Sequence, residues 1–148
     1  MANTYGFDPV AWSIDGGRHG GELLRILAYA ATGGSEGIVS PGDCKVHALA
    51  VPGTQVAIDA GAVLVRNRSA NVRNQTYAAS GRTETRLDVT NTGAAGGRSD
   101  LVVVRIEDPQ YAPWPKPSAA DAPTYQYVKP FIIENVPAGT KTLSLIHI

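Results

Sequence analysis

From residue 45 onward, apolar and polar residues alternate in short runs that glycine and proline separate, and this pattern restricts the chain to a mainly β fold. A period of two places successive side chains on opposite faces of a strand, so each run can bury one face. Sixteen glycines and ten prolines interrupt the runs too often for long helices. We expect strands at 45–51, 55–61, 62–68, 74–80, 82–90, 100–108 and 127–136.

The run at 101–106 differs from the others because it is apolar on both faces except at Arg105. Such a composition is typical of a central strand that is covered on both sides. We therefore expect a buried central strand whose core residues are Val102, Val104 and Ile106, together with most of Leu101 and Val103.

Residues 22–31 form the one segment with helical periodicity. Gly33 and Gly34 follow it and are expected to end the helix, because glycine readily adopts the left-handed cap conformation. About ten residues are too few for a helix that is stable alone in water. We therefore expect the helix to pack against the β domain or a neighbouring chain through an apolar stripe that contains Leu23, Ile26 and Leu27.

Residues 1–21 are expected to form an extended arm, because Pro9 and a cluster of glycines prevent a helix there. The arm carries large apolar side chains that must be buried against its own domain or a neighbouring subunit, among them Tyr5, Phe7 and Trp12. This predicts two regions, an arm with a docking helix at 1–38 and a β domain at 39–148.

Charge and motifs exclude several classes of function. Thirteen basic residues balance thirteen acidic ones, which leaves no electrostatic signal for nucleic acid, and no apolar run is long enough to span a membrane. A single cysteine, Cys44, rules out a disulfide within the chain and is consistent with assembly in a reducing cytoplasm. His19, His47 and His147 have no cysteine or carboxylate at a metal-ligand spacing. We expect no catalytic site, no bound metal and no cofactor.

A proline-rich loop between the last two predicted strands carries four aromatic residues. Five prolines make it unable to pair as a strand. Two interpretations remain open: the rings hold the loop on its sheet or on a partner chain, or they form a platform that stacks on host cell-wall glycans. The four residues are Tyr111, Trp114, Tyr125 and Tyr127.

Several phrases resemble the N-terminal region of minor tail proteins of actinobacteriophages, the upper baseplate or tail-tip family. They are "ELLRILAYAATGGSEGIVSPGDCKVHALAVPGTQVAIDAGAVLVRNR", "GGRSDLVVVRIEDPQY" and "VPAGTKTL", and they span most of residues 22–143. The resemblance implies a β-sandwich-like domain with a structural role in the virion and no catalysis. It also implies presentation of downstream receptor-binding domains. Together with the apolar surface of the arm and the helix, it leads us to expect assembly in the host cytoplasm with other tail proteins, as a trimer or hexamer.

The last six residues, Leu-Ser-Leu-Ile-His-Ile, are also the translation of a common transposase sequencing adapter. We therefore expect residues 143–148 to be read through from adapter DNA, and the natural chain to continue differently after about Thr142.

Overall fold

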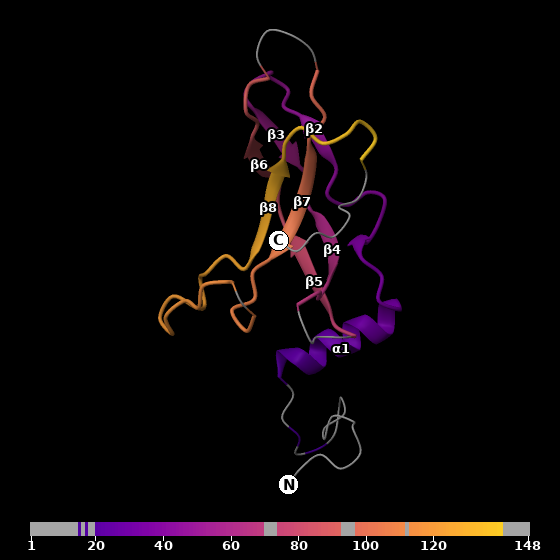
Figure 1. Cartoon of the computed structure of the whole chain (residues 1–148), viewed down its shortest axis with the longest axis vertical. Coiled ribbons are helices and arrows are strands. Elements are labelled where there is room, and N and C mark those ends of the chain that lie inside the picture. Colours follow the sequence, from indigo (N-terminus) through magenta and orange to yellow (C-terminus); the bar gives the residue numbers. More distant parts are fainter. Residues whose placement is uncertain are drawn as a thin grey trace.

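The computed structural model of the chain describes residues 15, 17, 20–69, 74–92, 97–111 and 113–140. Within them, one helix and eight strands follow one another along the sequence, so the chain is mainly β, as predicted (Figure 1). The elements are α1 (Gly21–Thr32), β1 (Gly37–Ile38), β2 (Val46–Ala48), β3 (Gln55–Ile58), β4 (Gly61–Arg66), β5 (Thr76–Gly81), β6 (Thr85–Asp88), β7 (Leu101–Ile106) and β8 (Val128–Ile133). The predicted arm contacts Tyr5, Phe7 and Trp12 lie outside the described residues, as does the terminal run 143–148.

The strands form three small antiparallel sheets, with strand orders β1-β4-β5, β2-β3-β6 and β7-β8. Figure 1 shows β7 and β8 running along the long axis, with the β2-β3-β6 sheet near one end and β4 and β5 toward α1. The antiparallel pair of β7 and β8 is called the β7-β8 hairpin below, although a long proline-rich loop joins its strands. Val104 of β7 and Val128 of β8 line one pocket together with Ile58 of β3 and Val63 of β4. The β7-β8 hairpin therefore covers a face of both other sheets.

The expectation of a buried central strand at 101–106 is wrong. Within the described part of the chain, β7 pairs only with β8, and all six of its residues are half-buried. Its two apolar faces have different neighbours: Val104 faces the pocket toward β3 and β4, whereas the proline-rich loop places Trp114 over Arg105. Coverage by a loop and by other sheets, rather than by strands on both sides, explains the composition of this strand.

The core is small. Among the described residues, Ala57 and Ile58 are the only hydrophobic residues that are buried. The other buried residues are polar or charged, namely Asn67, Gln75, Thr76 and Glu107. Much of the apolar surface of the sheets therefore stays within reach of solvent or of another chain.

The helix forms where the periodicity predicted it, and it ends at Gly33, whose φ of 62° is the left-handed conformation expected of a glycine cap. It contacts β5, but none of its residues is buried. Leu23 and Ile26 are half-buried and Leu27 is exposed. The predicted packing of the stripe is thus only partial, and α1 is also held by the polar contacts described below.

Candidate functional site

An apolar groove lies between the sheets. Its volume is about 390 Å³, and residues of β1, β2, β3, β4 and β7 line it. Ile38 of β1 and Val46 of β2 lie in the lining, and both remain exposed, with relative accessibilities of 60% and 48%. The lining of the groove is mostly valine, leucine and isoleucine, which suits burial against a protein rather than chemistry on a polar substrate.

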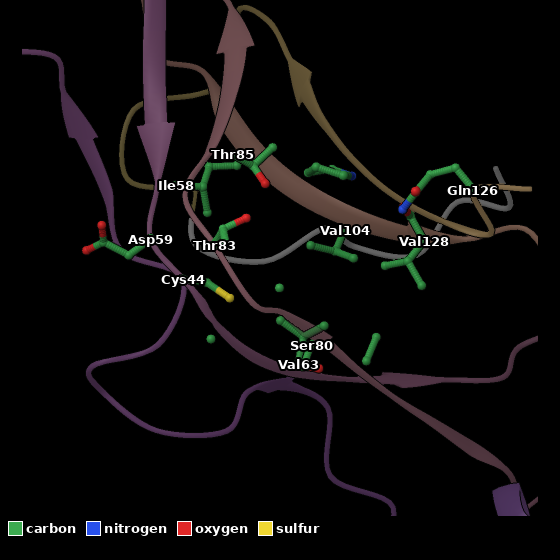
Figure 2. A pocket seen from close by; sticks show the side chains of 14 residues that line it. Cys44, Ile58, Asp59, Val63, Ser80, Thr83, Thr85, Val104, Gln126 and Val128 are labelled. Carbon is green, nitrogen blue, oxygen red and sulfur yellow. The ribbon is translucent and has the colours of Figure 1, made fainter. Parts of the chain in front are cut away.

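A second, smaller pocket of about 130 Å³ lies between β3, β4 and the β7-β8 hairpin. Figure 2 shows Cys44 and Val63 near one end of this pocket, with Val104 and Val128 across from them. Cys44 is half-buried, and burial, reinforced by the nearby charge of Asp43, raises the pKa of its thiol. A raised pKa keeps the thiol protonated, so Cys44 fits a structural role and not that of a nucleophile.

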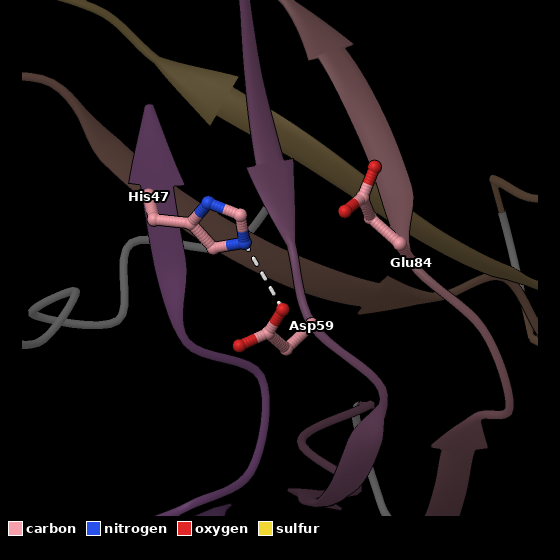
Figure 3. A group of neighbouring side chains, drawn as sticks. All are labelled: His47, Asp59 and Glu84. Carbon is pink, nitrogen blue, oxygen red and sulfur yellow. Dashed lines mark hydrogen bonds and ion pairs between the residues drawn. The ribbon is translucent and has the colours of Figure 1, made fainter. Parts of the chain in front are cut away.

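A cluster of polar side chains at the β2-β3-β6 sheet consists of His47, Asp59 and Glu84 (Figure 3). Of the three, Asp59 also lines the smaller pocket. One potential ligand atom from each residue lies within 4.8 Å of the other two. His47 Nε2 lies 3.0 Å from Asp59 Oδ1, and His47 Nδ1 lies 3.0 Å from the carbonyl oxygen of Ala48. The hydrogen bond to Ala48, followed by that to Asp59, raises the pKa of His47.

The cluster joins His47 to two carboxylates that the spacing of the sequence does not reveal. Asp59 follows His47 by 12 residues, and Glu84 follows by 37, so neither shows a local metal-ligand spacing. The antiparallel pairing of β2, β3 and β6 brings all three together. The proximity of the three side chains therefore follows from the order and register of the strands and not from their spacing in the sequence.

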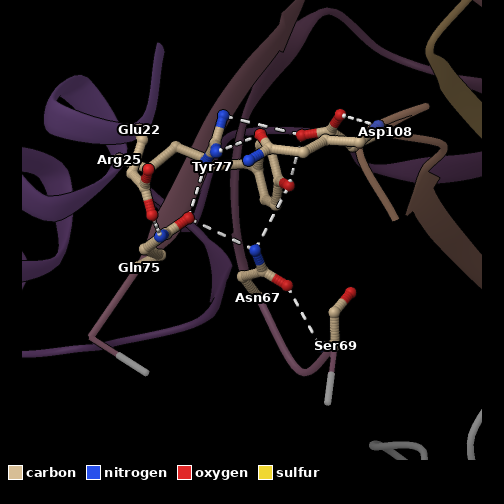
Figure 4. A network of polar contacts seen from close by, with 8 residues as sticks. Glu22, Arg25, Asn67, Ser69, Gln75, Tyr77 and Asp108 are labelled. Atoms are coloured by element: carbon tan, nitrogen blue, oxygen red, sulfur yellow. Dashed lines mark hydrogen bonds and ion pairs between the residues drawn. The ribbon is translucent and has the colours of Figure 1, made fainter. Parts of the chain in front are cut away.

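A polar network attaches α1 to the sheets (Figure 4). Its centre is the buried amide of Gln75, which donates to Glu22 Oε1 at 2.8 Å and accepts from Arg25 Nε at 2.7 Å. Asn67 Nδ2 donates to the same amide oxygen at 3.3 Å. The amide therefore joins two helical side chains to the segment between β4 and β5.

Arg25 continues the network toward the end of β7. Its guanidinium carbon lies 5.1 Å from the centre of the Tyr77 ring, and Nη1 lies 3.5 Å from Asp108 Oδ2. The Tyr77 hydroxyl donates to the same carboxylate oxygen at 2.7 Å, and burial, followed by this bond, raises the pKa of Tyr77. With its polar groups engaged within the chain, the network is suited to holding the helix rather than to acid–base chemistry.

The aromatic residues of the proline-rich loop contact their own chain. The Tyr125 and Tyr127 rings meet edge to face with centres 4.9 Å apart, and the Tyr127 hydroxyl donates to the carbonyl of Ala122 at 2.9 Å. Trp114 lies over the guanidinium of Arg105, 4.9 Å from ring centre to carbon. All four predicted residues, including Tyr111, are half-buried. These contacts favour the interpretation that the rings hold the loop on its sheet.

A buried carboxylate lies beneath this loop. The Glu107 side chain is only 5% exposed and accepts from Arg105 and Lys129, each at 2.6 Å. The Tyr125 hydroxyl lies 3.2 Å from the same carboxylate. The hydrogen bond from Lys129, with smaller support from Arg105 and Tyr125, lowers the pKa of Glu107. A carboxylate held ionised in this way anchors the loop and is a poor general acid.

Comparisons with known proteins add no relative to this picture: no family model, curated protein or solved structure matches the chain. Among the described residues, no helix is long and apolar enough to cross a membrane.

Proposed function

We propose that this chain is a structural subunit of a phage tail tip or baseplate, which assembles through its apolar groove and helix stripe. It has no catalytic role, and it presents downstream receptor-binding domains in the virion. The observation that carries the assembly proposal is the open apolar groove, combined with a core in which two described hydrophobic residues are buried. Contiguous apolar surface of this kind is typical of interfaces between proteins.

The partner that we propose for the groove is another copy of the chain, in a trimer or hexamer assembled in the host cytoplasm, with other tail proteins as further neighbours. Large apolar side chains are exposed both on the helix, at Leu24 and Leu27 of α1, and in the groove, at Ile38 of β1. Burying such residues between subunits would supply the hydrophobic contribution that the single chain lacks.

Support for a tail in particular comes from the resemblance of residues 22–143 to minor tail proteins. The mainly β fold and the short docked helix agree with the domain that this resemblance implies. The alternative, a carbohydrate-binding module that uses Trp114 and the loop tyrosines, receives less support because these rings are engaged within the chain.

The test is the oligomeric state in solution, measured by sedimentation velocity over a range of protein concentrations. Ile38→Asp and Val46→Asp place a charge in the groove at exposed positions, so they should leave the fold intact and dissociate the oligomer. Val51→Asp is the matched control, because Val51 is 80% exposed and does not line the groove. A wild-type chain that is a compact monomer at every concentration would disprove assembly through the groove, as would equal dissociation by the control.

A further inference from the structure

Three potential metal ligands project from one face of the β2-β3-β6 sheet. His47 pairs with Ala57 across β2 and β3, and Ala57 pairs with Arg86 across β3 and β6, so these three residues form one cross-strand row. Asp59 lies two residues after Ala57 and Glu84 two residues before Arg86, which the period of a strand places on the same face. The row has a small residue, Ala57, at its centre, so the longer side chains can converge above it (Figure 3).

The orientation of the imidazole provides an independent argument. A carbonyl oxygen can only accept a hydrogen bond, so the 3.0 Å contact with Ala48 requires that His47 Nδ1 carries its proton. In the neutral ring, Nε2 then presents a lone pair toward Asp59 Oδ1, 3.0 Å away. Two acceptors in this position need a proton or a cation between them. Donation from Nδ1–H to a carbonyl is also the usual way in which a protein orients a metal-binding histidine.

From this geometry we infer that His47, Asp59 and Glu84 bind a divalent transition-metal ion, for which zinc is the reference. One imidazole nitrogen and two carboxylates suit zinc better than magnesium or calcium, which prefer oxygen ligands alone. Bonds of about 2.1 Å place the ligands of a tetrahedral zinc ion about 3.4 Å apart. Since the present atoms lie within 4.8 Å of one another, the site closes by a movement of at most about 1.4 Å. All three side chains are partly exposed, so rotamer changes can supply that movement.

One competing cation is present in the same row. Arg86 Nε lies 3.0 Å from Glu84 Oε1, which leaves Glu84 Oε2 for the metal. Because Arg86 repels a bound cation, its removal should strengthen metal binding, whereas removal of a ligand should weaken it. The metal would tie together β2, the end of β3 and the start of β6. Its effect would be to stabilise this sheet, whether or not the chain belongs to a tail.

The experiment is isothermal titration of the untagged full chain with ZnCl₂ at pH 7.5, with CaCl₂ as the comparison ion. We expect one zinc ion per chain and no detectable calcium binding. His47→Ala and Glu84→Gln should each weaken zinc binding at least about tenfold, a loss within the range known for residues that merely support a metal ligand. Arg86→Gln should tighten it by roughly tenfold, as Coulomb's law in water gives for a unit charge about 6 Å from a divalent ion. Glu36→Gln is the matched control, because Glu36 pairs with Arg68 and is not among the three ligands.

A spectroscopic measurement separates this site from adventitious binding. Long-range ¹H–¹⁵N correlation spectra of the histidines should show zinc shifting the Nε2 resonance of His47, while Nδ1 keeps its proton. The inference is overturned if wild-type zinc binding is absent, if it is unchanged in His47→Ala, or if the His47 resonances do not respond. Because the site lies on one chain, a monomeric protein that binds zinc here would refute the assembly proposal and leave this inference standing.

Discussion

Replacing Gln75 by alanine is expected to loosen α1 from the sheets at a cost of about 3 kcal/mol in the free energy of unfolding. The amide of Gln75 is buried, and it bonds to Glu22 and Arg25 on the helix and to Asn67 beyond β4. Alanine removes all three bonds and cannot replace any of them. The effect should fall on the attachment of the helix, because the strand pairing between β4 and β5 does not use this side chain.

The magnitude follows from the partners of the amide. Two of its hydrogen bonds involve charged groups, each worth about 1.5 to 3 kcal/mol, and the bond from Asn67 is worth about 1 kcal/mol. Taken separately, these bonds add up to about 4 to 7 kcal/mol. Glu22 is exposed and can bind water instead, and Arg25 keeps its contacts with Asp108. Such recovery and non-additivity reduce the expected loss to about 3 kcal/mol.

Urea unfolding followed by circular dichroism measures this loss, and amide hydrogen exchange shows where it falls. The amides of α1 should lose protection before those of β4 and β5. Gln126→Ala is the matched control, because Gln126 is exposed and makes one described bond, to the carbonyl of Val128. It should cost less than about 1 kcal/mol. Equal losses in the two variants, or unchanged exchange in α1, would refute the argument that this amide holds the helix.

Three further predictions concern other parts of the chain. Gly61→Ala should destabilise the fold by about 1 to 3 kcal/mol in urea titrations, since its Cβ would collide with the backbone at Cys44, whereas Gly53→Ala, with open space around it, should be nearly neutral. Because the pKa of Glu107 is lowered, its ionised carboxylate stabilises the fold at a pH above 4.5, the ordinary pKa of the group, and this contribution should disappear as the pH falls below 4.5. Glu107→Gln should flatten that part of the profile of unfolding free energy against pH, and an unchanged profile would contradict the role assigned to Glu107. Trp114→Ala should lower stability by about 2 kcal/mol in thermal unfolding without changing binding on an array of host cell-wall glycans, whereas loss of glycan binding would favour the carbohydrate-binding alternative.

The local pattern of the sequence was sufficient for the existence and type of most elements. Short β-type runs bounded by glycine and proline, most of them alternating with a period of two, placed seven of the eight strands in the described part of the chain, and the glycine at 33 marked the end of α1. Both signals depend on neighbouring residues alone. The strand β1 was missed, since two residues, Gly37 and Ile38, are too few to show a period. The aromatic loop was also recognised from composition, because five prolines prevent it from pairing as a strand.

Which surfaces meet was decided only by the tertiary structure. The apolar run at 101–106 looked like a central strand, yet its burial comes from a loop and from other sheets, which no local window contains. The attachment of α1 through Gln75 and the convergence of His47 with Asp59 and Glu84 likewise join residues far apart in the chain. Such contacts depend on strand order and register, and these are selected by the free energy of packing the whole chain rather than by the residues beside each position.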